Sequence, residues 1–190
     1  DSRRRHVEVL RRILIEKGLN ISLDDYLSSK REGVSTYSWL LTKGLDEFLA
    51  REISEDWIVQ IEHEEYLKLD DLYEDSIKFL NRISNIASLH LVTSRSSEEL
   101  VRKQLTQLGI LGYFDTVDVV SPKKGKEAKL DVIRLIKPDI VIGDTEVDYL
   151  AAKSAGANFV FLTHGFRSHS FMKKYEFNQS CDSLNEVFDI

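Results

Sequence analysis

The sequence is poor in cysteine, in long apolar runs and in stretches of basic residues. Each of these shortages argues against one structural feature or one class of partner. A single cysteine, Cys181, excludes an internal disulfide and makes the reducing cytoplasm the expected location. No apolar run approaches the roughly 20 residues that a membrane-spanning helix needs, so no membrane partner is expected. Acidic residues (32) outnumber basic residues (26), and the basic residues form no long stripe, which argues against a nucleic-acid partner.

What remains is a chain of 190 residues, 42% of them hydrophobic, which can bury the core of one sizeable domain or of one domain with a small insert. Residues 3 to about 67 have a helical pattern throughout. Val7, Leu10 and Leu14 share one face of a first helix, and Gly18 is expected to end it. Apolar residues at spacings of three and four continue to residue 67, so no strand is expected in this half.

From residue 72 onward, helical segments alternate with short runs of Val, Ile and Leu. The alternation predicts an α/β fold with strands near 88–92, 116–120, 139–142 and 159–162, parallel in one Rossmann-like sheet with helices on both faces. The final segment "SLNEVFDI" is expected to form an ordinary terminal helix. Ligands of parallel sheets bind at the carboxyl ends of the strands, so polar residues there are the candidates for a site.

Three groups of polar residues fall at such ends, and each has an alternative interpretation. Thr93 and Ser94 could bind phosphate oxygens, or they could be a helix cap, for which Ser96 is another candidate. A lysine after the next strand could neutralise an anionic substrate, but most lysines in such a run are solvated. The candidates are Lys123, Lys124, Lys126 and Lys129.

Asp144 and Asp148 form the third group. Asp144 follows a buried strand and a glycine, and Asp148 lies one helical turn further on the same side. Carboxylate oxygens at this position suit Mg²⁺, which binds through one or two carboxylates, waters and substrate phosphate. The alternative is that Asp144 merely caps the following helix.

These residues resemble the haloacid dehalogenase superfamily, in the subgroup similar to phosphoglycolate phosphatase. Thr93 fits the second motif of that superfamily, and "GDTEVD" fits the fourth, a glycine followed by two aspartates four residues apart. The resemblance implies a helical cap domain at residues 4–70, inserted into an α/β core formed by residues 1–3 and 71–190.

The resemblance also implies a function, namely Mg²⁺-dependent hydrolysis of a small phosphate ester through an aspartyl-phosphate intermediate. Asp144 would hold the metal, Thr93 and Ser94 would contact phosphate, and Asp148 would orient the lysine or a metal-bound water. The motif lysine is Lys124 or Lys126. In the cap, Lys30 and Arg31 of "SKREGVS" would contact the substrate, or they form only an exposed basic turn. A monomer or a homodimer is expected.

The first motif of the superfamily, Asp-x-Asp-Gly-Thr, does not occur in residues 1–190. Its first aspartate is the nucleophile, and it ends the central strand of the sheet. We therefore expect the nucleophile upstream of Asp1, and either a gap or a foreign strand between the strands near 88–92 and 139–142. The alternatives are a non-catalytic relative that has lost the motif and a phosphomutase of the same fold.

Overall fold

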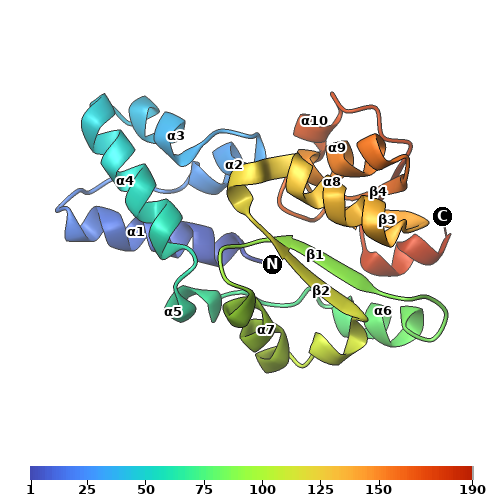
Figure 1. Cartoon of the computed structure of the whole chain (residues 1–190). Helices are drawn as coiled ribbons and strands as arrows, with labels where there is room; N and C mark the ends of the chain where they lie inside the picture. Colours follow the sequence, from blue (N-terminus) through green and yellow to red (C-terminus); the bar gives the residue numbers. More distant parts are fainter. Residues whose placement is uncertain (190) are drawn as a thin grey trace. The chain divides into compact units, whose positions relative to one another are not determined.

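The computed structural model describes residues 1–189 and divides into two compact units (Figure 1). A helical unit contains residues 1–71 and 166–171, and an α/β unit contains residues 72–165 and the chain from residue 172 onward. Residues 1–3, assigned to the core in the sequence analysis, lie in the helical unit. Within the part of the chain that is described, no helix is long and apolar enough to cross a membrane.

The helical unit is built from amphipathic helices that bury one face each. In α1, Val9, Leu10, Ile13 and Leu14 are buried at helical spacing, and the N–H of Gly18 bonds the carbonyl of Ile15 just beyond the helix. The helices are α1 (Arg3–Glu16), α2 (Tyr26–Arg31), α3 (Thr36–Thr42), α4 (Glu47–Gln60) and α5 (Glu64–Leu67). Helix α10 (His169–Met172) begins in the later segment of this unit, residues 166–171. Residues 1–71 contain no strand, as the pattern predicts.

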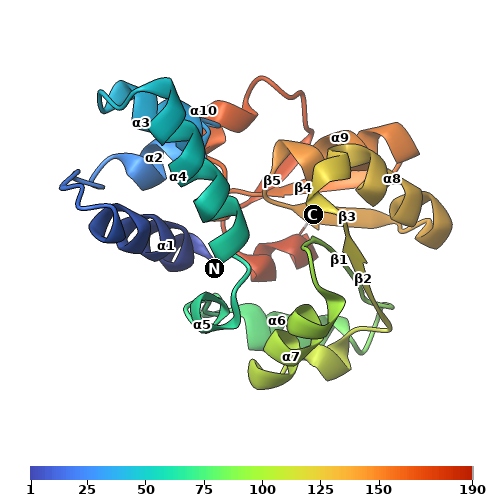
Figure 2. The ribbon, with the colours of Figure 1, turned by 60° about the vertical axis from the view of Figure 1, so that its left-hand side comes forward.

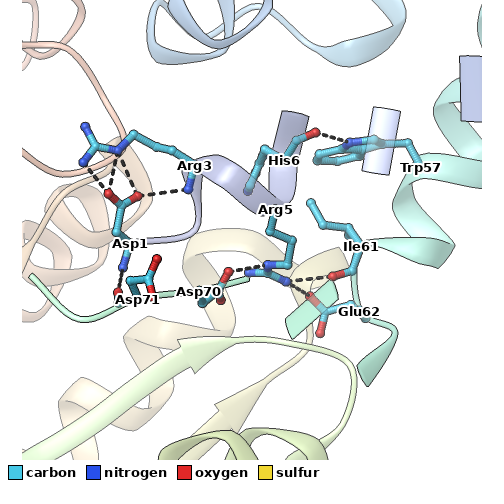
Figure 3. A network of polar contacts seen from close by, with 9 residues as sticks. All are labelled: Asp1, Arg3, Arg5, His6, Trp57, Ile61, Glu62, Asp70 and Asp71. Carbon is cyan, nitrogen blue, oxygen red and sulfur yellow. Dashed lines mark hydrogen bonds and ion pairs between the residues drawn. The ribbon is translucent and has the colours of Figure 1, made fainter. Parts of the chain in front are cut away.

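A buried arginine, Arg5, joins α1 to the chain between residues 61 and 70 of the helical unit (Figure 3). The Arg5 side chain is 6% exposed, and its Nε lies 2.8 Å from Asp70 Oδ1. Its Nη1 donates to the Ile61 carbonyl at 2.7 Å and lies 3.7 Å from Glu62 Oε1. Arg5 therefore links α1 to the chain on both sides of α5, at Ile61 and at Asp70.

The α/β unit contains only parallel strand pairs among its described residues, so the predicted class is confirmed. β1 pairs with β2 in one sheet and β3, β4 and β5 form another, so the predicted sheet is divided between β1 and β3, where a gap or a foreign strand was expected (Figures 1 and 2). The strands are β1 (His90–Ser94), β2 (Thr116–Val120), β3 (Ile140–Gly143), β4 (Asn158–Leu162) and β5 (Gln179–Cys181). Around them lie α6 (Ser76–Ile83), α7 (Glu98–Gln107), η1 (Leu111–Tyr113), η2 (Pro122–Lys124), α8 (Gly125–Ile136) and α9 (Glu146–Ala155).

Two elements hold the sheets together. Helix α8 packs on β1 and β2 and also on α9, which covers β3 and β4 (Figure 2). The 3₁₀ helix η3 (Leu184–Asp189) places Leu184 and Val187 in the apolar clusters of both sheets. This segment was expected to be an ordinary helix with Leu184, Val187 and Phe188 inward. The inward residues are as expected, but the turn is tighter, and Ile190 lies outside the described residues.

Strands β1 and β3 are not paired with each other anywhere in residues 1–189, as the expected gap requires. On β3, Ile140 is 46% exposed and Ile142 is 36% exposed, unusually high values for isoleucines in a parallel strand. Backbone groups along the unpaired edges of β1 and β3 would be satisfied by a strand lying between them.

Candidate active site

Thr93 and Ser94 are the last residues of β1, at its carboxyl end. Parallel pairing sets Thr93 opposite Val119 and Ser94 opposite Val120. The cap of the next helix, α7, is Ser97, whose side chain accepts from the Leu100 N–H at 3.2 Å, so neither Thr93, Ser94 nor Ser96 is the cap. Within residues 1–189 the hydroxyls of Thr93 and Ser94 make no hydrogen bond, so both are free to contact a ligand.

Asp144 and Asp148 follow β3, and the structure gives them different surroundings. Thr145 is the N-cap of α9, since its Oγ1 accepts from the Asp148 N–H at 3.4 Å. Asp148 completes the capping box, because its Oδ2 accepts from Thr145 N at 3.2 Å and from Thr145 Oγ1 at 2.6 Å. Thr145, and not Asp144, is therefore the N-cap residue of α9.

The second oxygen of Asp148 binds a lysine from a different helix. Lys129 Nζ lies 2.5 Å from Asp148 Oδ1, and both side chains are only 13% exposed. Lys124 and Lys126, named in the sequence analysis, lie at the N-terminus of α8 about one turn before Lys129. Neither side chain makes an ion pair or hydrogen bond within the described residues. The sequence analysis weighed Lys129 with three other lysines but named Lys124 or Lys126 as the motif lysine, because spacing alone does not give the phase of α8.

Two glycines make room for the two aspartates. A Cβ on Gly143 would lie 2.9 Å from Asp148 Cγ, and a Cβ on Gly165 would lie 2.7 Å from Asp144 Oδ2. Gly165 follows β4, the neighbour of β3 in the sheet. The backbone at the end of β3 and the backbone just after β4 thus approach the carboxylates so closely that only glycine fits. Sequence reasoning did not identify Gly165, which lies 21 residues after Asp144.

Magnesium is the metal that the donor chemistry at Asp144 fits. The described residues contain no group of three or more His, Cys, Asp or Glu side chains that could hold a metal. A zinc or calcium site built entirely from these side chains is not indicated. A single carboxylate suits Mg²⁺, which keeps several waters and takes further oxygens from a substrate.

Lys30 and Arg31, the predicted substrate contacts, lie at the end of α2 in the helical unit. Lys30 is partly buried and its ammonium lies 4.6 Å from the centre of the Trp57 ring, so it does not belong to an exposed basic turn. Burial and the nearby charge of Arg167 lower the pKa of Lys30 to about 8. The Arg31 carbonyl accepts from the Ser168 N–H at 3.2 Å.

The fold and the site together define a class. Parallel strands flanked by helices carry hydroxyls, a lysine–aspartate pair and a further aspartate at or just after their carboxyl ends, as in α/β enzymes that bind phosphate. Residues 1–156 match the haloacid dehalogenase-like hydrolase family, and the chain belongs to this family. The resemblance inferred from Thr93 and "GDTEVD" is therefore confirmed.

The chain is similar to phosphoglycolate phosphatases from Vibrio. It is 32% identical to that of Vibrio vulnificus strain YJ016 over 154 residues, which cover 74% of this chain and 64% of the relative. It is 28% identical to that of Vibrio parahaemolyticus over 151 residues, which cover 74% of this chain and 63% of the relative. The matched chain thus spans less than two thirds of the length of these relatives.

Solved structures show the same fold. A haloacid dehalogenase-like hydrolase from Streptococcus pneumoniae superposes with a TM-score of 0.79 at 19% identity, covering 100% of this chain and 91% of the other. A HAD-superfamily hydrolase of subfamily IA from Geobacter sulfurreducens superposes with a TM-score of 0.69 at 20% identity, covering 100% and 89%.

Proposed function

We propose that the protein is a Mg²⁺-dependent phosphatase that hydrolyses a small phosphorylated metabolite. The observation that carries this proposal is the largely buried Lys129–Asp148 pair, one helical turn after Asp144. A buried ion pair needs a reason beyond stability, because apolar residues of similar size are often at least as stable in its place. Helix α8, which carries this fixed ammonium, packs on β1, the strand that ends with Thr93 and Ser94. The ammonium would supply the positive charge that a phosphoryl group requires.

In this proposal each residue of the chain has a distinct task. Thr93 and Ser94 donate hydrogen bonds to phosphate oxygens, and Lys129 neutralises their charge, taking the place first given to Lys124 or Lys126. Asp148 is a positioning residue, since its capping box and its bond to Lys129 fix the ammonium. Asp144 would hold Mg²⁺, which when bound would offset the repulsion between the phosphate and an attacking carboxylate.

The nucleophile of this proposal is an aspartate outside residues 1–190. It would end a strand between β1 and β3, whose facing edges are unpaired within the described residues. Its carboxylate attacks phosphorus, an aspartyl-phosphate forms as the alcohol leaves, and water then releases phosphate. The helical unit would act as the cap that excludes water and contacts the leaving group through Lys30 and Arg31.

The Vibrio relatives, named phosphoglycolate phosphatases, make phosphorylated carboxylic acids the first substrates to test. The experiment uses the protein as its gene encodes it and measures phosphate release from 4-nitrophenyl phosphate and 2-phosphoglycolate with Mg²⁺. Lys129→Met is expected to lower kcat/KM by at least about a hundredfold, the scale of one lost transition-state contact. Lys126→Met is the matched control, from the same helix, and is expected to change it less than about threefold, well below that scale.

The same experiment tests the alternatives. A non-catalytic relative is favoured by one observation, that residues 1–190 contain no Asp-x-Asp. If the encoded protein contains no such aspartate and releases no phosphate, the phosphatase proposal is wrong. If Lys126→Met loses activity and Lys129→Met does not, the assignment of the lysine is wrong. A phosphomutase would instead convert a sugar phosphate into its isomer without net release of phosphate.

A further inference from the structure

Helix α4 of the helical unit has apolar side chains on two different faces. Its inner face packs on α1 and α3 (Figure 2). On its outer face Phe48 is 79% exposed, Ile58 is 60% exposed and Val59 is 64% exposed. The outer face of a surface helix is normally polar, and large apolar side chains that gather there mark an interaction surface. The buried residues of the inner face are Ala50, Ile53 and Trp57.

The exposed apolar residues share their face with one arginine and one glutamate. We call this set the α4 stripe; it consists of Phe48, Arg51, Glu55, Ile58 and Val59, all of them exposed. Each residue turns an α-helix by about 100°, so the five side chains fall within an arc of about 100°. The first four are separated by three, four and three residues, which is the heptad spacing of helices that pair side by side.

The two charged residues of the α4 stripe have no ionic partner within residues 1–189. The guanidinium of Arg51 lies 5.5 Å from the centre of the Tyr37 ring and makes no ion pair, and neither does Glu55. By contrast, Glu52 on the same helix lies 2.7 Å from Lys17 Nζ. An arginine that precedes a glutamate by four residues is in the less favourable order for a pair within one helix. Both charges of the stripe are therefore available to another chain.

The order of residues along the α4 stripe matches itself when it is reversed. It runs apolar, cation, anion, apolar, with the same spacing from either end. If a second α4 lies antiparallel to the first, a two-fold axis midway between Arg51 and Glu55 sets Arg51 opposite the partner's Glu55. The same axis sets Phe48 opposite the partner's Ile58. Two-fold symmetry repeats each contact, so two ion pairs and two apolar pairs form.

We propose that the α4 stripe is the contact surface of a homodimer, in which two copies of α4 pack antiparallel about a two-fold axis. A different protein would not require a stripe that is complementary to itself. The stripe has five side chains on each copy, against about 20–30 residues on each side of a standard stable interface. We therefore expect a reversible dimer with a Kd in the micromolar range. The proposal is independent of the phosphatase proposal, because the stripe contains none of the residues assigned to phosphate or metal.

Sedimentation velocity of the protein, as its gene encodes it, tests the proposal over a range of concentrations. The parent is expected to change reversibly from monomer to dimer as its concentration rises. In Arg51→Glu two glutamates would face each other at each charged contact, and in Glu55→Arg two arginines would. Each variant alone is therefore expected to raise the Kd of the dimer at least about tenfold.

An equal mixture of Arg51→Glu and Glu55→Arg is the decisive sample. In the mixed dimer both charged contacts again join a glutamate to an arginine, so the Kd is expected to return to that of the parent. Phe48→Ser is expected to raise the Kd at least about tenfold, the scale of a buried aromatic contact. Leu135→Ser is its matched control, since Leu135 is 82% exposed on α8 and lies outside the stripe, and is expected to dimerise like the parent.

Circular dichroism shows whether each variant keeps its helices, and the charge variants test the proposal even if Phe48→Ser does not fold. The homodimer proposal is wrong if the parent stays monomeric at every concentration, including the case in which the stripe binds a different protein. It is also wrong if Arg51→Glu and Glu55→Arg each dimerise like the parent. A mixture that remains monomeric would overturn the antiparallel two-fold arrangement.

Discussion

Replacing Lys30 by methionine should change how the stability of the helical unit depends on pH. Burial, together with the charge of Arg167, lowers the pKa of Lys30 from its usual 10.5 to about 8 in the folded protein. Between pH 8 and 10.5 the unfolded chain holds a proton that the folded protein has released, so the free energy of unfolding rises with pH in this window. The cost of burying the charge is fully present below pH 8 and disappears above pH 10.5.

The size of the effect follows from the same two pKa values. At about 1.4 kcal/mol for each pH unit, the fall from 10.5 to about 8 corresponds to about 3 kcal/mol. Methionine has a similar length and no charge, so Lys30→Met does not carry this cost. The free energy of unfolding of the variant minus that of the parent should therefore decrease by about 3 kcal/mol from pH 7 to pH 10.5.

Urea unfolding followed by tryptophan fluorescence measures this difference, because Trp39 and Trp57 both lie in the helical unit. The other groups that titrate near pH 10 are common to both proteins and cancel in the comparison. Lys30→Leu should give the same slope, since the slope belongs to the lysine of the parent. A difference that stays constant between pH 7 and 10.5 would show that the ammonium of Lys30 is solvated in the folded protein, and the reasoning would be wrong.

Three further predictions concern other contacts of the two units. Arg5→Ala removes a cationic partner of Asp70 in a largely buried place and should lower the free energy of unfolding by about 3–5 kcal/mol in urea denaturation. A loss below about 1 kcal/mol would mean that water solvates this network. Asp144→Asn should lower phosphate-ester hydrolysis by at least about a hundredfold with little change in melting temperature, and an unchanged rate with the same Mg²⁺ dependence would remove Asp144 from the metal site. Gly165→Ala places a methyl group 2.7 Å from Asp144 Oδ2 and should lower kcat/KM, whereas Gly112→Ala, which meets open space, should not; equal rates in both variants would contradict the close approach at Gly165.

The choice of lysine shows where sequence reasoning stopped. The sequence predicted a lysine at the carboxyl end of the strand Thr116–Val120, and four lysines satisfied that description. The resemblance then pointed to Lys124 or Lys126, not to Lys129. Helix α8 begins at Gly125, so Lys129 lies one turn inside it and faces Asp148, while Lys124 and Lys126 remain at its start. The rotation of a helix about its axis is set by packing against β1, β2 and α9, which spacing in the sequence does not contain.

The short strand β5 was missed for a similar reason. Gln179–Cys181 has three residues, two of them polar and exposed, and shows neither an apolar run nor an alternating pattern. It is a strand because its backbone pairs with β4, whose residues from Phe159 to Leu162 are all buried. Tertiary pairing determines such a segment, and local preference does not.

The sequence by itself determined the features that depend on local periodicity and motif spacing. The helical half, the parallel strands after residue 72 and the pair Asp144 and Asp148 could all be read from it, because apolar patterns and strand ends are local properties. Only the tertiary structure decided which groups meet across the chain. It separated the strands into two sheets, brought Lys129 to Asp148, set Gly165 against Asp144 and placed Arg167 beside Lys30, since each of these contacts joins segments whose spacing in the sequence carries no information about their distance in space.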